Sequence, residues 1–138
     1  TGLAGACMPD FPACRRQYRA HQHTMEDRVG ELRAQVRTAL AGASPALARL
    51  AALDAVLDRA LAAHQRRLLE KLPALLDKRL RALQAARPDH APAPAGTAAA
   101  ALAVGPTLQR VLLAELETRL QPVQGLIDAI GHDAAAAA

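Results

Sequence analysis

Aromatic side chains are almost absent from this sequence, which contains one Phe, one Tyr and no Trp in 138 residues. Apolar residues still make up 51% of the chain, and nearly all of them are Ala, Leu or Val. Ala and Leu favour helices, and no run has the β-branched and aromatic composition of a strand. The composition therefore predicts an all-α protein, and the length allows one domain with a modest core.

Cysteine is also scarce, because only Cys7 and Cys14 are present. Seven residues along one helix separate two side chains by about 10 Å, which is too far for a disulfide. A zinc site could be drawn from these cysteines with His21 and His23, but the spacing matches no compact zinc motif. We therefore expect a reduced cysteine pair and no bound metal.

Catalytic motifs are missing as well. The sequence has no Ser, His and Asp constellation, no glycine-rich phosphate loop and no acidic pair beside a pocket-forming segment. His64 lies within a row of leucines, where a core histidine bonded to a neighbour is the better interpretation than a ligand-binding one. We expect no enzyme activity, no catalytic residues and no cofactor.

No apolar run approaches the ~18 residues of a membrane span, and no signal segment is present. We therefore expect a soluble, cytoplasmic protein without a transmembrane segment. The first residue is Thr1 rather than Met, which favours a processed chain or a fragment with residues missing upstream.

Lysine is rare, so arginine supplies most of the positive charge behind the net charge of +4 and the pI of 9.8. This balance suits an acidic partner, but GC-rich coding also enriches Arg and Ala, and both explanations stay open. Interleaved acids and the lack of aromatic residues for base stacking favour a solvated surface over a nucleic-acid site. Nucleic-acid binding is therefore the alternative function, on a basic edge of Arg15, Arg16, Arg19, Arg66 and Arg67.

Leucines, by contrast, recur with helical spacing through residues 44–87. The first part of this row falls on one stripe of a helix and predicts a packed face. Past Pro73 the apolar face turns by about a quarter of a circle. The first stripe comprises Leu50, Leu53, Leu57, Leu61, Leu68, Leu72 and Leu75. The second face, predicted to bind a partner, comprises Leu69, Leu72, Leu76, Leu80 and Leu83.

Serine and proline residues mark the ends of these helices. Ser44 followed by Pro45 predicts a helix start, because serine caps free amides and proline needs no donor at the first position. Pro73 removes one backbone hydrogen bond and crowds the carbonyl four residues earlier, so we expect a kink or break near Leu72. An equally long stripe over residues 13–40 and a loop at 41–43 predict an antiparallel hairpin.

The chain divides into five predicted segments. The last helix should bend at Pro122 and end at Gly131, with Glu115 and Arg119 forming a surface pair. The segments are an irregular N-terminus at 1–10, the hairpin with its kinked extension at 11–87, a Pro/Ala-rich linker at 88–105, a kinked C-terminal helix at 106–131 and a disordered or artefactual tail at 132–138. Within the linker, residues 88–96 are predicted to be mobile, whereas residues 98–104 could be helical or irregular.

Asp54 lies at the margin of the first leucine stripe, where the first helix should bring Arg28, Arg33 or Arg37 close to it. These opposite charges suggest an ion pair between the two helices of the hairpin, and we predict Arg33 as the partner of Asp54. Simple solvation of Asp54 is the other interpretation, and both stay open. Such a pair sets helix register more reliably than it adds stability.

Four runs of this sequence resemble a family of uncharacterised proteobacterial proteins of unknown function, over most of residues 11–130. They are YRAHQHTME, GELRAQVRTAL, SPALARLAALDAVLDRALAAHQRRLLEKLPALLDKRLRAL and LQRVLLAELETRLQPVQGLIDAI. The family's genes often lie beside those of MotA- or ExbB-like channel subunits and OmpA-like, peptidoglycan-binding proteins, and its members carry a further N-terminal helical portion. The resemblance implies an adaptor in an envelope-associated or motor-like assembly, at the periphery of the inner membrane. The family has no known catalytic or binding residues to carry over.

The predicted fold is a three- to four-helix bundle: a long antiparallel helical hairpin, a Pro-kinked extension and a C-terminal helix that packs back. Few large side chains are available, so part of the leucine surface should stay bare in a monomer. We therefore expect self-association or a helical protein partner, and a non-enzymatic interaction or adaptor function.

Overall fold

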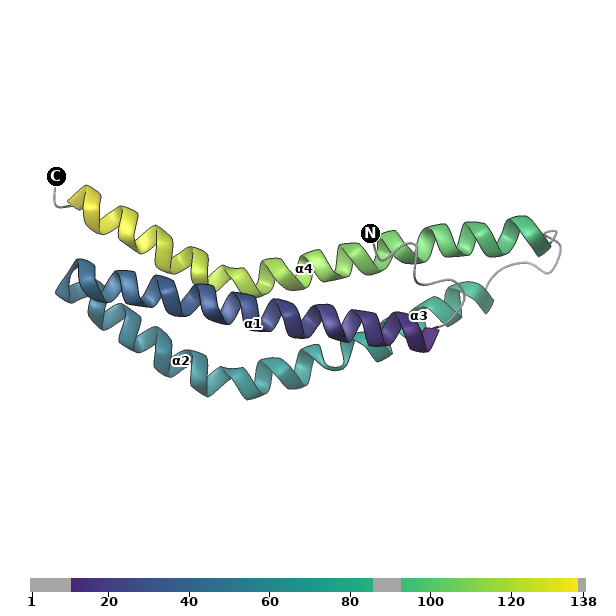
Figure 1. Cartoon of the computed structure of the whole chain (residues 1–138), viewed down its shortest axis with the longest axis horizontal. Coiled ribbons are helices and arrows are strands. Elements are labelled where there is room, and N and C mark those ends of the chain that lie inside the picture. The colour runs from purple at the N-terminus through teal and green to yellow at the C-terminus, as the bar shows by residue number, and fades with distance from the viewer. Residues whose placement is uncertain (1–10, 86–92, 137–138) are drawn as a thin grey trace. The chain divides into compact units, whose positions relative to one another are not determined.

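The protein is described by a computed structural model over residues 11–85 and 93–136, without side chains at 11, 80, 83–85 and 93–105. Its four helices are α1 (Phe11–Ala43), α2 (Pro45–Leu69), α3 (Leu72–Ala85) and α4 (Ala93–Ala136) (Figure 1). No strand occurs in these ranges, and the predicted all-α class is confirmed. None of the described helices carries an apolar run that would cross a bilayer. The predicted irregular segment at 1–10 lies outside the described residues.

The chain forms two compact units. Unit 1 comprises Thr1–His23 and Leu69–Glu115, so its described part holds the start of α1, all of α3 and the first part of α4. Unit 2 comprises Thr24–Leu68 and Leu116–Ala138 and holds the rest of α1, nearly all of α2 and the end of α4. In unit 2, α1 and α2 run side by side in opposite directions, as the hairpin prediction requires (Figure 1).

A single residue, Ser44, connects α1 to α2. The Leu47 amide donates to Ser44 Oγ at 3.3 Å, and the Ala48 amide donates to the Ser44 carbonyl at 2.9 Å. The predicted serine cap is therefore confirmed. The predicted loop at 41–43 is wrong, because α1 continues through Gly42; an interior glycine costs only about 1 kcal/mol relative to alanine.

Pro73 breaks the helix that follows, as predicted. Helix α2 ends at Leu69, Glu70 and Lys71 form a turn, and α3 begins at Leu72. Pro73 thus lies at the second position of α3, where its missing N–H would have no partner inside that helix. Its ring is buried in unit 1.

The core of unit 2 is small and made of aliphatic residues from three helices. Leu40 is fully buried beside Leu47 and Ala51 of α2 and Leu126 of α4. The C-terminal helix therefore packs back on the hairpin within this unit. The interior of unit 1 contains Cys14, Tyr18, Leu108 and Leu112.

The first leucine stripe does not form this core, so that part of the prediction is wrong. Leu53, Leu57, Leu61 and Leu68 are exposed, and Leu50 is only partly buried. Helix α2 instead turns the side containing Leu47, Ala51 and Asp54 toward its neighbours. The reason is electrostatic, because the carboxylates of α2 meet arginines of α1 on that side.

Helix α4 is longer than the predicted C-terminal helix at 106–131. It begins at Ala93, inside the segment predicted as a linker, and it continues through Pro122 and Gly131 to Ala136. Alanine has the highest helix propensity, and the run at 98–101 contains nothing else. The helical structure at 93–105 therefore differs from the linker prediction, and residues 86–92 and 137–138 lie outside the described ranges.

Candidate functional site

Three polar side chains meet inside unit 1. Tyr18 and Gln22 stand one turn apart on α1, Glu115 comes from α4, and each is at most 9% exposed. The Tyr18 hydroxyl donates to Glu115 Oε2 at 3.1 Å, and Gln22 Nε2 donates to the two carboxylate oxygens at 3.2 and 3.0 Å. A carboxylate loses its hydration when it is buried, so these donors replace water around it. The cluster joins α1 to α4 within unit 1.

Gln22 also compensates for the break at Pro73. Proline has no N–H, so the carbonyl four residues earlier, at Leu69, lacks its helical donor. Gln22 Nε2 donates to this Leu69 oxygen at 3.1 Å. A side-chain amide has two N–H donors, and Gln22 directs them to Leu69 and Glu115. One glutamine thus satisfies an acceptor on α2 and an acceptor on α4.

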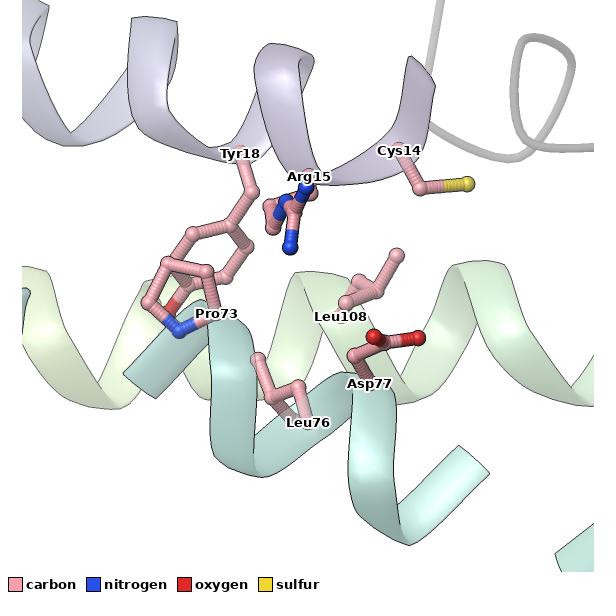
Figure 2. Close-up of a pocket in the computed structure, with 7 residues that line it drawn as sticks. All are labelled: Cys14, Arg15, Tyr18, Pro73, Leu76, Asp77 and Leu108. Atoms are coloured by element: carbon pink, nitrogen blue, oxygen red, sulfur yellow. The ribbon is translucent and has the colours of Figure 1, made fainter. Parts of the chain in front are cut away.

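A small cavity lies beside this cluster (Figure 2). Its volume is about 20 Å³, which fits one water molecule and is far below the ~300 Å³ of a small-molecule site. This cavity therefore offers no room for a substrate. The cavity is lined by Cys14, Arg15, Tyr18, Pro73, Leu76, Asp77 and Leu108.

Unit 2 contains a second polar group, which we call the α1–α2 quartet: Arg33, Arg37, Asp54 and Asp58. Arg33 donates from Nε to Asp54 Oδ2 at 2.9 Å and from Nη1 to Asp58 Oδ1 at 2.8 Å. Arg37 Nη2 donates to Asp58 Oδ2 at 2.8 Å. The structure thus places Arg33 and Asp54, the two residues of the hypothetical hairpin pair, in direct contact. Asp58 was not predicted, although its i,i+4 spacing from Asp54 matches that of the two arginines.

The quartet is largely shielded from solvent, because the Arg33 and Asp54 side chains are only 13% and 12% exposed. The hydrogen bond to Asp54 raises the pKa of Arg33, and the charges of Asp58 and Asp54 add to this effect against desolvation. A raised pKa means that the Arg33 charge stabilises the fold at every pH below the ordinary arginine value. This contribution is lost only as the pH rises beyond that range.

The predicted interaction face falls within unit 1. Leu69, Leu72 and Leu76 are partly buried there, and Leu76 lines the small cavity. The side chains of Leu80 and Leu83 lie outside the described set. The larger exposed apolar surface lies on α2 in unit 2, and we call it the α2 stripe. It consists of Leu53, Val56, Leu57, Leu61 and Leu68, which are between 48% and 57% exposed.

The remaining candidates for chemistry are scattered. His64 is exposed, so the expectation of a core histidine is wrong, and His21 and His23 are exposed as well. Cys14 is buried, and Cys7 lies outside the described residues. Across the described ranges, no three His, Cys, Asp or Glu side chains are grouped as metal ligands would be.

Two charged residues of α4 differ in exposure from what was expected. Glu115 and Arg119 are buried, so the predicted surface position of this pair is wrong. Of the basic edge, Arg15, Arg16 and Arg19 are exposed in unit 1. Arg66 in unit 2 lies 3.5 Å from Glu26, which offsets part of its charge.

Comparison with known protein families gave a match over most of the chain. A family described as "Protein of unknown function (DUF3348)" matches residues 4–132. No curated protein and no solved structure matches the chain.

Proposed function

This chain belongs to the family of proteins of unknown function designated DUF3348, and from that premise we propose that it is a non-enzymatic interaction subunit of a larger bacterial assembly. The proposal rests on the α2 stripe. Five large apolar side chains on one helix remain about half exposed in unit 2.

Exposed leucines in this number favour a binding surface over a solvated one. Single apolar side chains at a protein surface are normal, but contiguous patches are typical of interaction sites. Covering a half-exposed leucine stabilises a complex by roughly 1 kcal/mol. The stripe therefore supplies several kcal/mol to any partner that fits it.

The interior of the protein supports the same reading. The donors and acceptors of the unit 1 cluster bind one another, and no buried side-chain oxygen or nitrogen of the described residues lacks a partner. Reactive groups at an active site must be able to reach a substrate, and the adjacent cavity has room for only one water-sized molecule. These contacts therefore support a structural role for the cluster.

The assembly that we propose is envelope- or motor-associated and lies at the periphery of the inner membrane. This finer statement rests on the resemblance between the four sequence runs and proteins encoded beside MotA/ExbB-like and OmpA-like genes. Adaptors in such assemblies need protein-binding surfaces, which the α2 stripe provides.

A photo-crosslinking amino acid placed at Leu61 tests the proposal in cells. We expect it to give a discrete protein adduct, whether with another copy of the chain or with a different protein. The same group at Glu117, which is exposed on α4 of unit 2, is the matched control and should give none. If position 61 yields no adduct beyond that control, the interaction function is wrong.

Nucleic-acid binding is the alternative, and the exposure of Arg15, Arg16 and Arg19 favours it. It requires tight binding that weakens steeply with salt, because bound phosphates release counterions. Replacing the three arginines by glutamine should then reduce binding in a gel-shift titration. A flat titration with the unaltered chain would remove this alternative.

A further inference from the structure

The charges on α2 are sorted by sign between its two sides. Its only carboxylates, Asp54 and Asp58, face α1 and bind the arginines of the quartet. Every charged side chain that α2 exposes is an arginine: Arg49, Arg59, Arg66 and Arg67. The outward side of this helix therefore combines leucine with positive charge.

Two of these arginines stand at opposite ends of the α2 stripe. At about 100° per residue, Arg49 and Arg67 project from the helix axis in the same direction. This direction lies between those of Leu53 and Val56, about 40° from that of Leu53. They are 18 positions apart, which corresponds to about 27 Å along a helix. A partner helix lying on the stripe would meet a cation near each of its ends.

This arrangement defines the chemistry of the partner. Apolar residues at i, i+3, i+4 and i+7 spacing would cover the leucines. Carboxylates placed about 18 positions apart would pair with Arg49 and Arg67, whose planar guanidinium groups bind carboxylates in a bidentate manner. The aliphatic stems of the two arginines would extend the apolar contact.

A second copy of this chain fits the surface poorly. Its α2 would bring four more exposed arginines, while its two carboxylates stay inside its own quartet. Two α2 helices packed antiparallel about a twofold axis would place Arg49 of one near Arg67 of the other. Such like-charge contacts disfavour association.

We propose that the α2 stripe binds an amphipathic helix of a different protein, with an apolar face flanked by acidic residues at both ends. This inference rests on the proposed interaction function and specifies its partner.

The binding of two synthetic peptides to the full chain tests this proposal about the partner. Each peptide is a stapled helix of about 22 residues that carries the same leucine spacing, and the two differ only in Glu or Lys at the positions facing Arg49 and Arg67. Fluorescence anisotropy should show the Glu peptide binding at least tenfold more tightly, with an advantage that shrinks as salt is raised.

Three variants identify the surface. The double change Leu57→Gln and Leu61→Gln should abolish binding while circular dichroism keeps its helical signal, because both side chains are already half exposed. Arg49→Gln with Arg67→Gln should remove the preference for Glu over Lys. Arg110→Gln, on the exposed surface of α4, should leave the preference unchanged.

The proposal is overturned if the two peptides bind equally, or if Arg110→Gln matches the Arg49 and Arg67 double variant. Two further results overturn it: a crosslinked adduct at position 61 that is a second copy of the chain, or displacement of the Glu peptide by phosphatidylglycerol vesicles. If the adduct at position 61 is a second copy of the chain, the proposed interaction function still stands. Only the absence of any adduct at position 61 removes both proposals.

Discussion

Gln22 donates hydrogen bonds to two acceptors: the Leu69 carbonyl, which lacks its helical donor because of Pro73, and the Glu115 carboxylate. Gln22→Met keeps the side-chain volume but removes both hydrogen bonds. Leaving a buried acceptor without a donor costs about 1–3 kcal/mol, so we expect a loss of that order or larger in the free energy of unfolding by urea. Gln35→Met, at an exposed position of α1, is the control and should change stability little. Equal effects of both changes would contradict the proposed role of Gln22.

The role of Gln22 shows where sequence reasoning ends at the residue scale. Pro73 predicts that the Leu69 carbonyl loses its donor, and this follows from local geometry alone. The identity of the replacement donor depends on partners 47 and 93 positions away from Gln22. No local pattern contains such a pairing, and a polar residue within a helix normally reads as solvated.

At the scale of whole helices, a substitution in the α1–α2 quartet tests whether its ion pairs hold the hairpin together. Asp54→Asn removes one charge and turns an amide N–H₂ toward Arg33, whose side chain is mostly shielded from solvent. A hydrogen bond to a charged group contributes about 1.5–3 kcal/mol, so we expect the free energy of unfolding to fall by about 2 kcal/mol. Asp27→Asn, at an exposed position of α1, should have little effect in the same thermal and urea measurements. Unchanged melting in Asp54→Asn would mean that the quartet does not hold the hairpin.

Helix boundaries were predictable where a residue acts on the backbone of its own segment. Ser44 caps α2 through its hydroxyl, and Pro73 ends the continuous helix through its missing N–H. The start of α4 was not predictable in this way, because its prolines and alanines predicted a linker at 88–105. Proline at the first turn of a helix is well tolerated, and Pro94 is the second residue of α4.

The division between interior and surface of unit 2 gives a prediction for the molecule as a whole. Leu40 is fully buried, whereas Leu61 is 57% exposed. Leu40→Ala should therefore cost about 2–5 kcal/mol in the free energy of unfolding, as is usual for buried leucines. Leu61→Ala should stay within about 0.5 kcal/mol of the unaltered chain. Comparable losses for the two variants, measured on the isolated protein by urea unfolding, would place Leu61 in the core after all.

Leucine periodicity predicted the existence of an apolar face on α2 but not the direction in which it points. A stripe at helical spacing is equally consistent with a core and with a surface for another protein. The side of α2 that faces α1 carries Asp54 and Asp58, which pair with the arginines there. From the sequence, Asp54 was equally consistent with a pair and with solvation, and Asp58 was not predicted. The excess of apolar surface was predictable from composition, whereas its position depended on tertiary ion pairs.

The one-residue connection at Ser44 restricts how the chain can vary in length. Inserting a residue between Arg37 and Ser44 would rotate both arginines by about 100° and shift them by about 1.5 Å relative to α2. The guanidinium groups would then miss the aspartates, and no loop is available to absorb the change. Insertions and deletions compatible with this fold must therefore fall outside the tip of the hairpin.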